Sequence, residues 1–200
     1  GMVTTSNDDL ADKIRCLRDH GATMSDLQRH LGSKPYLLAD HPEAGFNQRM
    51  TDIQAALGSA QMDRAEEIIT ERQRLAKIYD SAFSKLSWLR TPDTVEDYEH
   101  GYQSYPCMFK PQTALKNIEK VNTERNELME YLQSAGISTR PATHAVHMLS
   151  FYKNKYSIMP NDYINAYVAN ECSISLPLFH GMLESEQEYV IEKVLEANIS

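Results

Sequence analysis

Residues 45–58 read Gly-Phe-Asn-Gln-Arg-Met-Thr-Asp-Ile-Gln-Ala-Ala-Leu-Gly, and they lead from an irregular segment into a long helix. Thr51 and Gln54 have the spacing of a capping box, in which each side chain binds the backbone of the other residue. Beyond them, apolar residues recur with a period near 3.6, which predicts a helical region over 51–86 with a break near 61–63. A helix of this length is typical of a link between two domains or of a subunit interface.

Asn47 and Arg49 stand directly before this helix. A helix start presents unpaired N–H groups and a partial positive charge, so an amide and a guanidinium beside it suit a phosphate group. The alternative is an ordinary helix cap in which Arg49 pairs with Asp52. The preceding segment 22–48 has no clear period. A loop of that length in a compact domain usually has a function, such as binding. The other interpretation is a disordered loop.

The second half of the chain alternates between extended and helical patterns. Strands are predicted over 102–109, 137–140 and 172–178, and helices over 122–135 and after a second capping box at Ser185 and Glu188. A further helix is predicted between Ser6 and Gly21. This order predicts an α+β (α/β) fold, with a small, mainly antiparallel sheet and helices on one face.

Composition excludes several classes of protein. The chain has 200 residues with 28 acidic and 20 basic side chains, and its formal net charge of −8 argues against nucleic acid as a partner. The sequence has no apolar run that could span a membrane, and its first residues do not resemble a secretory signal. Cys16, Cys107 and Cys172 are far apart, which indicates buried thiols in a reducing cytoplasm.

His144 and His147 form a second candidate cluster, directly after the predicted strand 137–140. A polar substrate pocket at the end of a strand is one interpretation, since loops on a rigid scaffold carry binding groups. A metal site is another, but no acidic or cysteine side chain nearby completes a ligand set, and we expect no metal. Packed or solvated histidines are the third. From the residues alone, the chain is an α+β domain with a site for a phosphate-type ligand.

Several segments resemble, in the right order, motifs of the DegT/DnrJ/EryC1/StrS family of sugar aminotransferases, which depend on pyridoxal phosphate. The strongest is 45–58 with Gln61 after it, and the others are Gly1–Thr5 (Gly-Gly-x-Val-x-Thr), 17–21 (Leu-Arg-x-His-Gly), 72–79 (Arg-x-x-x-Ala-x-x-Tyr), 136–137 and 175–178. Together they cover nearly the whole chain and match the C-terminal half of the family.

The resemblance implies part of a fold-type I enzyme. Residues 1–50 would be a remnant of the large domain, 51–86 a linking helical region, and 87–200 the small C-terminal α+β domain. No lysine here matches the one that forms the Schiff base, so no catalytic residue is assigned. The resemblance therefore implies a truncated enzyme, inactive alone, or one that a companion chain completes.

Family positions carry over to four residues. Asn47 and Arg49 match the pair that reaches across a homodimer to the neighbour's cofactor phosphate, although Gln48 replaces the usual aromatic residue between them. His147, with His144 beside it, matches a position on the substrate side, but the proline and leucine that normally precede it are missing.

The implied reaction moves an amino group from glutamate to a keto-sugar nucleotide, in amino-sugar and cell-surface polysaccharide biosynthesis. A non-catalytic dimerisation or regulatory module with the same fold is the alternative, and a metal-binding or hydrolytic domain built on the two histidines is a third. We expect a cytoplasmic homodimer or higher oligomer that associates through residues 22–70, because the apolar stripe of the long helix requires a partner.

Overall fold

The chain divides into two units, Gly1–Asp63 and Arg64–Ser200. The computed structural model describes residues 2–23, 28, 31, 36, 38–197 and 199. Gly1 and much of segment 24–37 therefore lie outside the described residues, and with them part of the expectations for the first strand and for loop 22–48.

The first unit contains α1 (Asp8–Arg18) and α3 (Asp52–Met62). Asn7 caps α1 by accepting the N–H of Leu10 at 2.9 Å. The predicted capping box of α3 is present: Thr51 Oγ1 accepts the N–H of Gln54, and Gln54 Oε1 accepts the N–H of Thr51. Neither of these two helices has a fully buried residue, and α1 half-buries Ala11, Ile14, Cys16 and Leu17.

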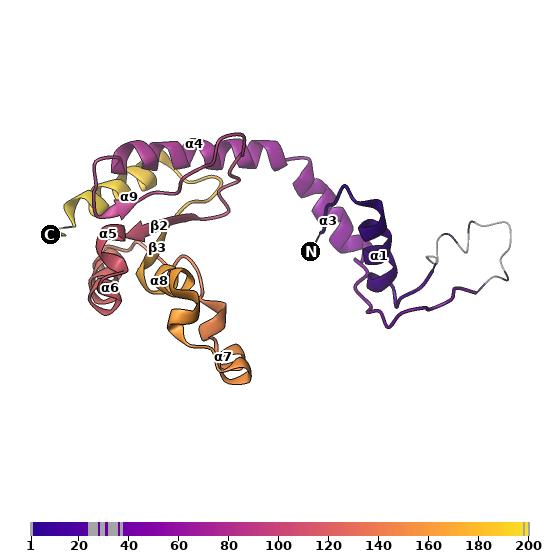
Figure 1. The fold of residues 1–200 in the computed structure, drawn as a ribbon. Helices are drawn as coiled ribbons and strands as arrows, with labels where there is room; N and C mark the ends of the chain where they lie inside the picture. The colour runs from indigo at the N-terminus through magenta and orange to yellow at the C-terminus, as the bar shows by residue number, and fades with distance from the viewer. Residues whose placement is uncertain are drawn as a thin grey trace. The chain divides into compact units, whose positions relative to one another are not determined.

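The second unit is built around a three-stranded antiparallel sheet with strand order β1-β2-β3 (Figure 1). The strands are β1 (Leu89–Arg90), β2 (Tyr105–Phe109) and β3 (Ser173–Leu176). The register places Cys107 of β2 opposite Ile174 of β3. Alternate residues of β2 are buried, as a period of two requires for a strand with one face toward a core.

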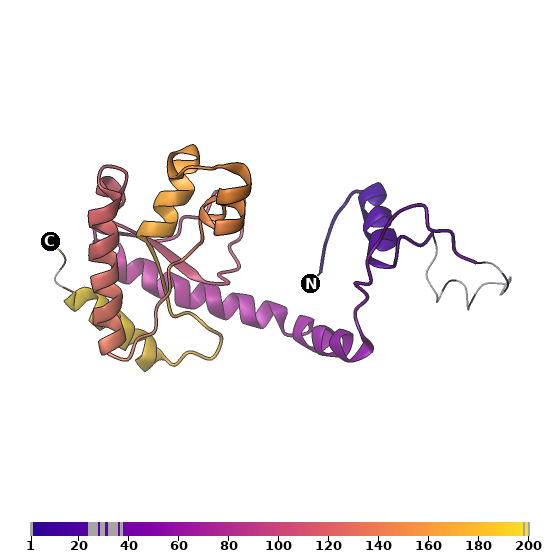
Figure 2. The same ribbon diagram turned by 90° about the horizontal axis from the view of Figure 1, so that it is seen from below.

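Helices α4, α6, α8 and α9 pack around this sheet (Figures 1 and 2). The helical elements of this unit are α4 (Ala65–Phe83), α5 (Pro111–Ala114), α6 (Ile118–Ser134), η1 (Val146–Met148), α7 (Ser150–Tyr156), η2 (Pro160–Tyr163), α8 (Ile164–Cys172) and α9 (Glu184–Glu196). Among the described residues, no helix combines the length and apolar character that crossing a membrane requires.

The core of the second unit is centred on α4. Leu75, Tyr79 and Phe83 of this helix are almost completely buried. The ring of Tyr79 lies 5.0 Å from the ring of Tyr105, and its hydroxyl donates to the carbonyl of Pro177 at 2.9 Å. This packing joins α4 to β2 and to the segment after β3.

Arg72, one turn before this core, joins α4 to the loop that precedes β2. Its guanidinium Nη1 donates to the carbonyl of Tyr102 at 2.7 Å and to that of Gln103 at 3.0 Å. The carbonyl of Leu178, after β3, lies at 3.5 Å from the same nitrogen. One side chain thus binds the backbone next to both strands, at the end of the pair where β2 begins and β3 ends.

Two of the thiols are buried as expected, and the third is not. Cys107 and Cys172 are buried in the second unit, whereas Cys16 is half-buried on α1. Burial raises the pKa of Cys172 to about 11 and raises the pKa of Cys107 further. Both buried thiols therefore stay protonated at neutral pH and are poor nucleophiles.

The α+β class, the antiparallel sheet and the helix break are confirmed, and two local predictions are wrong. Segment 137–140 forms only a single bridge, between Arg140 and Ser175, because Pro141 has no N–H to continue the ladder. The last helix begins at Glu184 and not after Ser185, and the Glu186 carboxylate accepts the N–H of Leu183 at 2.8 Å.

Candidate functional site

A short antiparallel ladder in the first unit holds the Asn47–Arg49 segment against the end of α1. The N–H of Gln48 donates to the carbonyl of Arg18 at 2.8 Å, and the N–H of His20 donates to the carbonyl of Phe46 at 2.9 Å. These bonds flank a bridge between Asp19 and Asn47. The segment is therefore fixed by its backbone, whatever its side chains do.

Two glycines allow this ladder to form. A Cβ atom on Gly45 would lie 2.1 Å from the backbone nitrogen of Gly21, and one on Gly21 would lie 2.0 Å from the carbonyl oxygen of Glu43. Gly21 also has a positive φ of 76°, a conformation that glycine adopts without strain. The two backbones approach each other only because both residues lack a side chain.

The ladder gathers Asn47, Arg49 and Asp19 on one face. In a bridge flanked by hydrogen bonds on both sides, the opposed side chains lie close together, and residues two apart on a strand share a face. Arg49 Nη1 forms an ion pair with Asp19 Oδ1, which confirms that these two side chains meet. Asp19 keeps 15% of its side chain exposed and Arg49 keeps 43%, so Arg49 is oriented by a shielded carboxylate and still reaches solvent.

The sequence left open an ordinary helix cap in which Arg49 pairs with Asp52. This alternative is wrong, because Arg49 pairs with Asp19. A guanidinium has five donors, so pairing with Asp19 leaves donors for a second acceptor.

A wide hollow of about 1250 Å³ opens beside this face. Three arginines line it: Arg15 and Arg18 from α1, and Arg49 from the ladder. Gln48 and Gln54 also line it, the latter from the first turn of α3. The three guanidinium groups and the positive end of a helix favour an anionic ligand.

His144 and His147 lie in the second unit and differ in environment. His147 is buried in η1, with 8% exposure, and its ring centroid lies 5.2 Å from that of Tyr163. Among the described residues, its Nε2 atom has no hydrogen-bond partner. His144 is exposed, and the loop that carries both is fixed where the N–H of Ala145 donates to the Asn170 side chain at 2.9 Å.

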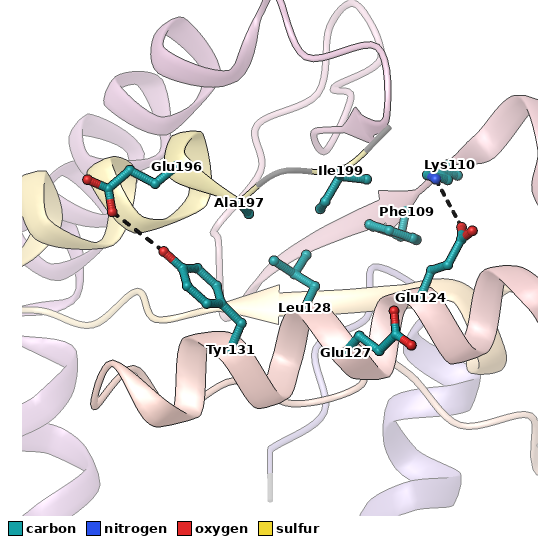
Figure 3. A pocket seen from close by; sticks show the side chains of 9 residues that line it. All are labelled: Phe109, Lys110, Glu124, Glu127, Leu128, Tyr131, Glu196, Ala197 and Ile199. Carbon is teal, nitrogen blue, oxygen red and sulfur yellow. Dashed lines mark hydrogen bonds and ion pairs between the residues drawn. The ribbon is translucent and has the colours of Figure 1, made fainter.

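Other features of the described residues do not join these clusters. No group of three or more His, Cys, Asp and Glu side chains is placed to hold a metal in the described part of the chain. A pocket of about 450 Å³ lies between α6 and the ends of β2 and α9 (Figure 3). Its charged residues include Lys110 and Glu124, which pair at 2.9 Å, and none of the four predicted site residues lines it.

The structure thus brings Asn47 and Arg49 together, whereas the histidines belong to the other unit. Sequence reasoning did not assign Asp19, Arg15 or Arg18 to the site. Asp19 and Arg18 lie in the Leu-Arg-x-His-Gly segment that resembles a family motif, and this resemblance is the sequence signal for them. Arg15 and Arg18 are one turn apart on α1, so helical spacing could have placed them on one face.

Comparison with known proteins gives a consistent result over nearly the whole chain. The DegT/DnrJ/EryC1/StrS aminotransferase family matches residues 1–195. An uncharacterized protein of Methanocaldococcus jannaschii, MJ1066, is 32% identical over 97% of this chain and 48% of its own length. The GDP-perosamine synthase of Caulobacter vibrioides is 30% identical over 96% of this chain and 46% of its own length.

A solved structure agrees with these sequence matches. The putative sugar aminotransferase Spr1654 of Streptococcus pneumoniae is 27% identical, with a TM-score of 0.74, over 96% of this chain and 46% of that one. The chain therefore spans about half the length of the relatives it matches. With the family match and the shared fold together, the chain belongs to the DegT/DnrJ/EryC1/StrS aminotransferase family.

Proposed function

We propose that this chain supplies one part of a pyridoxal-phosphate-dependent aminotransferase that transfers an amino group from glutamate to a keto-sugar nucleotide. The observation that carries the proposal is the shared face of Asn47, Arg49 and Asp19 beside the arginine-lined hollow. The name of one relative, a GDP-perosamine synthase, supports a substrate that is a nucleotide-linked sugar.

The residues of this face fit the phosphate of the cofactor. Asn47 supplies an amide N–H₂, Arg49 supplies a guanidinium held by Asp19, and α3 begins three residues after Arg49, at Asp52. Charge-assisted hydrogen bonds to a phosphate are stronger than neutral ones, and a guanidinium matches phosphate oxygens in pairs. When bound, pyridoxal phosphate would supply the chemistry that carries an amino group from donor to acceptor. In this proposal, the phosphate belongs to a cofactor carried by a neighbouring subunit.

His147, with His144, lies on the substrate side in the proposal. The buried Nε2 of His147 has no partner among the described residues, and a buried polar atom without a hydrogen bond is costly. A hydroxyl of a sugar substrate would satisfy it. His144 is exposed three residues earlier and contributes a second imidazole at the edge of the same loop.

The activity requires residues beyond these 200. The matched relatives are about twice as long as this chain, and the proposal assigns the catalytic lysine to the remaining part of the enzyme. We expect the isolated chain to hold no covalently bound cofactor. An absorbance band from a lysine-linked cofactor in the 200-residue protein would contradict this expectation.

The test joins this chain to the lysine-bearing half of a relative and measures cofactor retention and the half-reaction with glutamate. Arg49→Ala should weaken retention by about 1.5–3 kcal/mol, the cost of removing a hydrogen bond to a charged group. Arg90→Ala is the control, because Arg90 is exposed on β1 in the other unit. Unchanged retention in the double variant Asn47→Ala/Arg49→Ala would remove the phosphate assignment.

A second candidate, a non-catalytic dimerisation module, is favoured by the apolar surface of α3. Ile53, Leu57 and Met62 of this helix are 85%, 65% and 61% exposed. Exposed apolar patches of this kind mark interaction surfaces. Sedimentation of the 200-residue chain at micromolar concentration tests the point: a dimer that Leu57→Glu disrupts supports self-association through α3, and a monomer opposes it.

A further inference from the structure

We propose that Asn170 of α8 is a positioning residue for the substrate side of the proposed enzyme. Through Ala145 it holds η1, the helical turn that carries His147, and so fixes the imidazole assigned to the sugar. Asn170 does not touch the substrate, and it acts through the backbone of residues 140–147, which we call the histidine loop. The inference rests on the proposed function, because it explains how one residue of that site is oriented.

The first observation is the position of Ala145 at the start of η1. Ala145 is almost completely buried, with 1% exposure, although the residues on both sides of it are exposed. Its N–H donates to Asn170 Oδ1 at 2.9 Å, and its carbonyl accepts the N–H of Met148 at 2.8 Å. The second of these bonds closes the turn in which His147 lies. Asn170 therefore holds this turn at its first residue, two positions before the imidazole.

Two other contacts hold the histidine loop, and both lie further along the chain from the imidazole. Arg140 and Ser175 form a backbone bridge, with N–H···O distances of 2.7 and 3.4 Å. Ala142 donates its N–H to Ser173 Oγ at 3.2 Å. The bond to Asn170 is the nearest of the three to the imidazole, so it controls the orientation of η1 most directly.

The amide of Asn170 has one orientation that satisfies its neighbours. Its Nδ2 donates to Glu171 Oε1 at 2.7 Å, and an ionised carboxylate has acceptors only. A flipped amide would turn its oxygen toward the carboxylate and its N–H₂ toward the N–H of Ala145. Asn122 of α6, which packs on α8, donates to Glu171 Oε2 at 2.9 Å and to the Glu171 carbonyl at 2.8 Å. The carboxylate is thus held by α6, and it directs the Asn170 oxygen toward the histidine loop.

The imidazole that these contacts hold has one atom left for a ligand. His147 is 8% exposed, and its ring centroid lies 5.2 Å from that of Tyr163. Its Nε2 has no hydrogen-bond partner within the part of the chain that the structure describes. A ligand gains from such a group only when the group is held in the productive geometry. A shift of η1 would change the direction of Nε2 together with the packing of the ring on Tyr163.

The first test uses NMR spectroscopy of the 200-residue chain. In Asn170→Ala, the amide of Ala145 loses its acceptor, so its hydrogen exchange should become about threefold to tenfold faster, the effect of one lost hydrogen bond. The ring resonances of His147 should shift, because the contact with the Tyr163 ring changes. Asn170→Asp should have the same effects at neutral pH, because it places a second carboxylate oxygen at the 2.7 Å contact with Glu171.

A rescue variant exchanges the two side-chain groups. In Asn170→Asp/Glu171→Gln, the amide introduced at position 171 donates to the carboxylate introduced at position 170, and its oxygen accepts the N–H₂ of Asn122. Donor and acceptor are exchanged, each hydrogen bond is restored and the total charge is unchanged. The exchange rate of Ala145 and the ring resonances of His147 should return to their original values. A residue that contributed only volume or helix propensity would show no such rescue.

Two control variants separate positioning from a general loss of stability. Asn165→Ala removes an exposed asparagine from the same helix, α8. Gln187→Leu removes another amide hydrogen bond in the same unit, from a buried Nε2 to the carbonyl of Leu75 at 2.7 Å. Neither variant should move the ring resonances of His147.

Three results of this test would overturn the proposal. The first is an Ala145 amide and a His147 ring that are unchanged in Asn170→Ala. The second is a failure of the exchanged pair to restore them. The third is an equal shift of the His147 resonances in Gln187→Leu.

The second test uses the enzyme completed with the lysine-bearing half of a relative, with a GDP-linked keto-hexose as the amino acceptor. Asn170→Ala should raise the KM for this acceptor about threefold to tenfold and leave kcat within about twofold, the pattern of a lost binding contact. The half-reaction with glutamate should be unchanged, since it involves no sugar. An unchanged acceptor KM in an enzyme that carries out this half-reaction would refute the present inference alone.

Failure of the half-reaction in the unsubstituted enzyme would refute the proposed function instead. The His147 resonances of the 200-residue chain would still decide whether Asn170 positions that imidazole.

Discussion

Gly45 offers the sharpest perturbation of the candidate site, because its replacement acts on the backbone and not on any ligand-binding atom. In Gly45→Ala, the new Cβ would lie 2.1 Å from the backbone nitrogen of Gly21 and 2.6 Å from the carbonyl carbon of His20. Both atoms are backbone, so no flexible side chain can move aside. The two segments of the ladder must separate.

The expected magnitude follows from the bonds that cross this contact. Three backbone hydrogen bonds, of 2.7, 2.8 and 2.9 Å, join 17–20 to 46–48. Each contributes about 0.5–1.5 kcal/mol, so the loss of all three would lower the stability of the ladder by about 1.5–4.5 kcal/mol. Arg49 would then lose its fixed position beside Asp19.

Amide hydrogen exchange at His20, Phe46 and Gln48 measures this effect directly, since these residues donate the three bonds. Their protection should fall in Gly45→Ala. Gly58→Ala is the matched control, because a Cβ there meets no atom within 4 Å and the residue lies inside α3. That change should stabilise α3 by about 0.5–1 kcal/mol. Full protection of Phe46 and Gln48 in Gly45→Ala would refute the account of the ladder.

Two further predictions concern the second unit. Gln187 is buried, and its Nε2 donates to the carbonyl of Leu75 at 2.7 Å. Gln187→Leu should therefore lower the free energy of unfolding, measured by urea titration, by about 1 kcal/mol. The control Glu188→Gln, at an exposed neighbouring residue, should have little effect. Burial raises the pKa of Cys172 from 9.0 to about 11, so the folded state keeps the proton that the unfolded state loses. The thiol's contribution to stability is therefore complete below pH 9 and is lost as the pH rises toward about 11; urea midpoints across this window should fall less in Cys172→Ala, and an equal fall in both proteins would contradict the assignment.

Local signals in the sequence predicted the elements that depend on local physics. The spacing of Thr51 and Gln54 correctly predicted the start of α3. The break before α4 falls at Asp63 and Arg64, next to the break predicted near residues 61–63. Segment 137–140 failed as a strand because its pairing with β3 depends on a distant partner and stops at one bridge. Contacts between distant residues also limited the prediction of the site. Asn47 and Arg49 could be identified because they precede a helix start. The ion pair of Arg49 with Asp19 could not, because the two residues are thirty positions apart and meet only through the close backbone approach of Gly21 and Gly45.

The Arg72 contacts have a consequence for how this family can be studied by sequence variation. All the acceptors of Arg72 are main-chain carbonyls, those of Tyr102, Gln103 and Leu178. A carbonyl is present whatever side chain its residue carries, so no change at these three positions can compensate for the loss of the guanidinium. Lysine is not an equivalent replacement, since its ammonium is a strongly hydrated point charge on a flexible stem, whereas the guanidinium is planar and preorganised. In an alignment, position 72 should therefore be invariant and should show no covarying partner, and contact inference from covariation would miss the side chain that joins the backbones of both strands at one end of the β2–β3 pair.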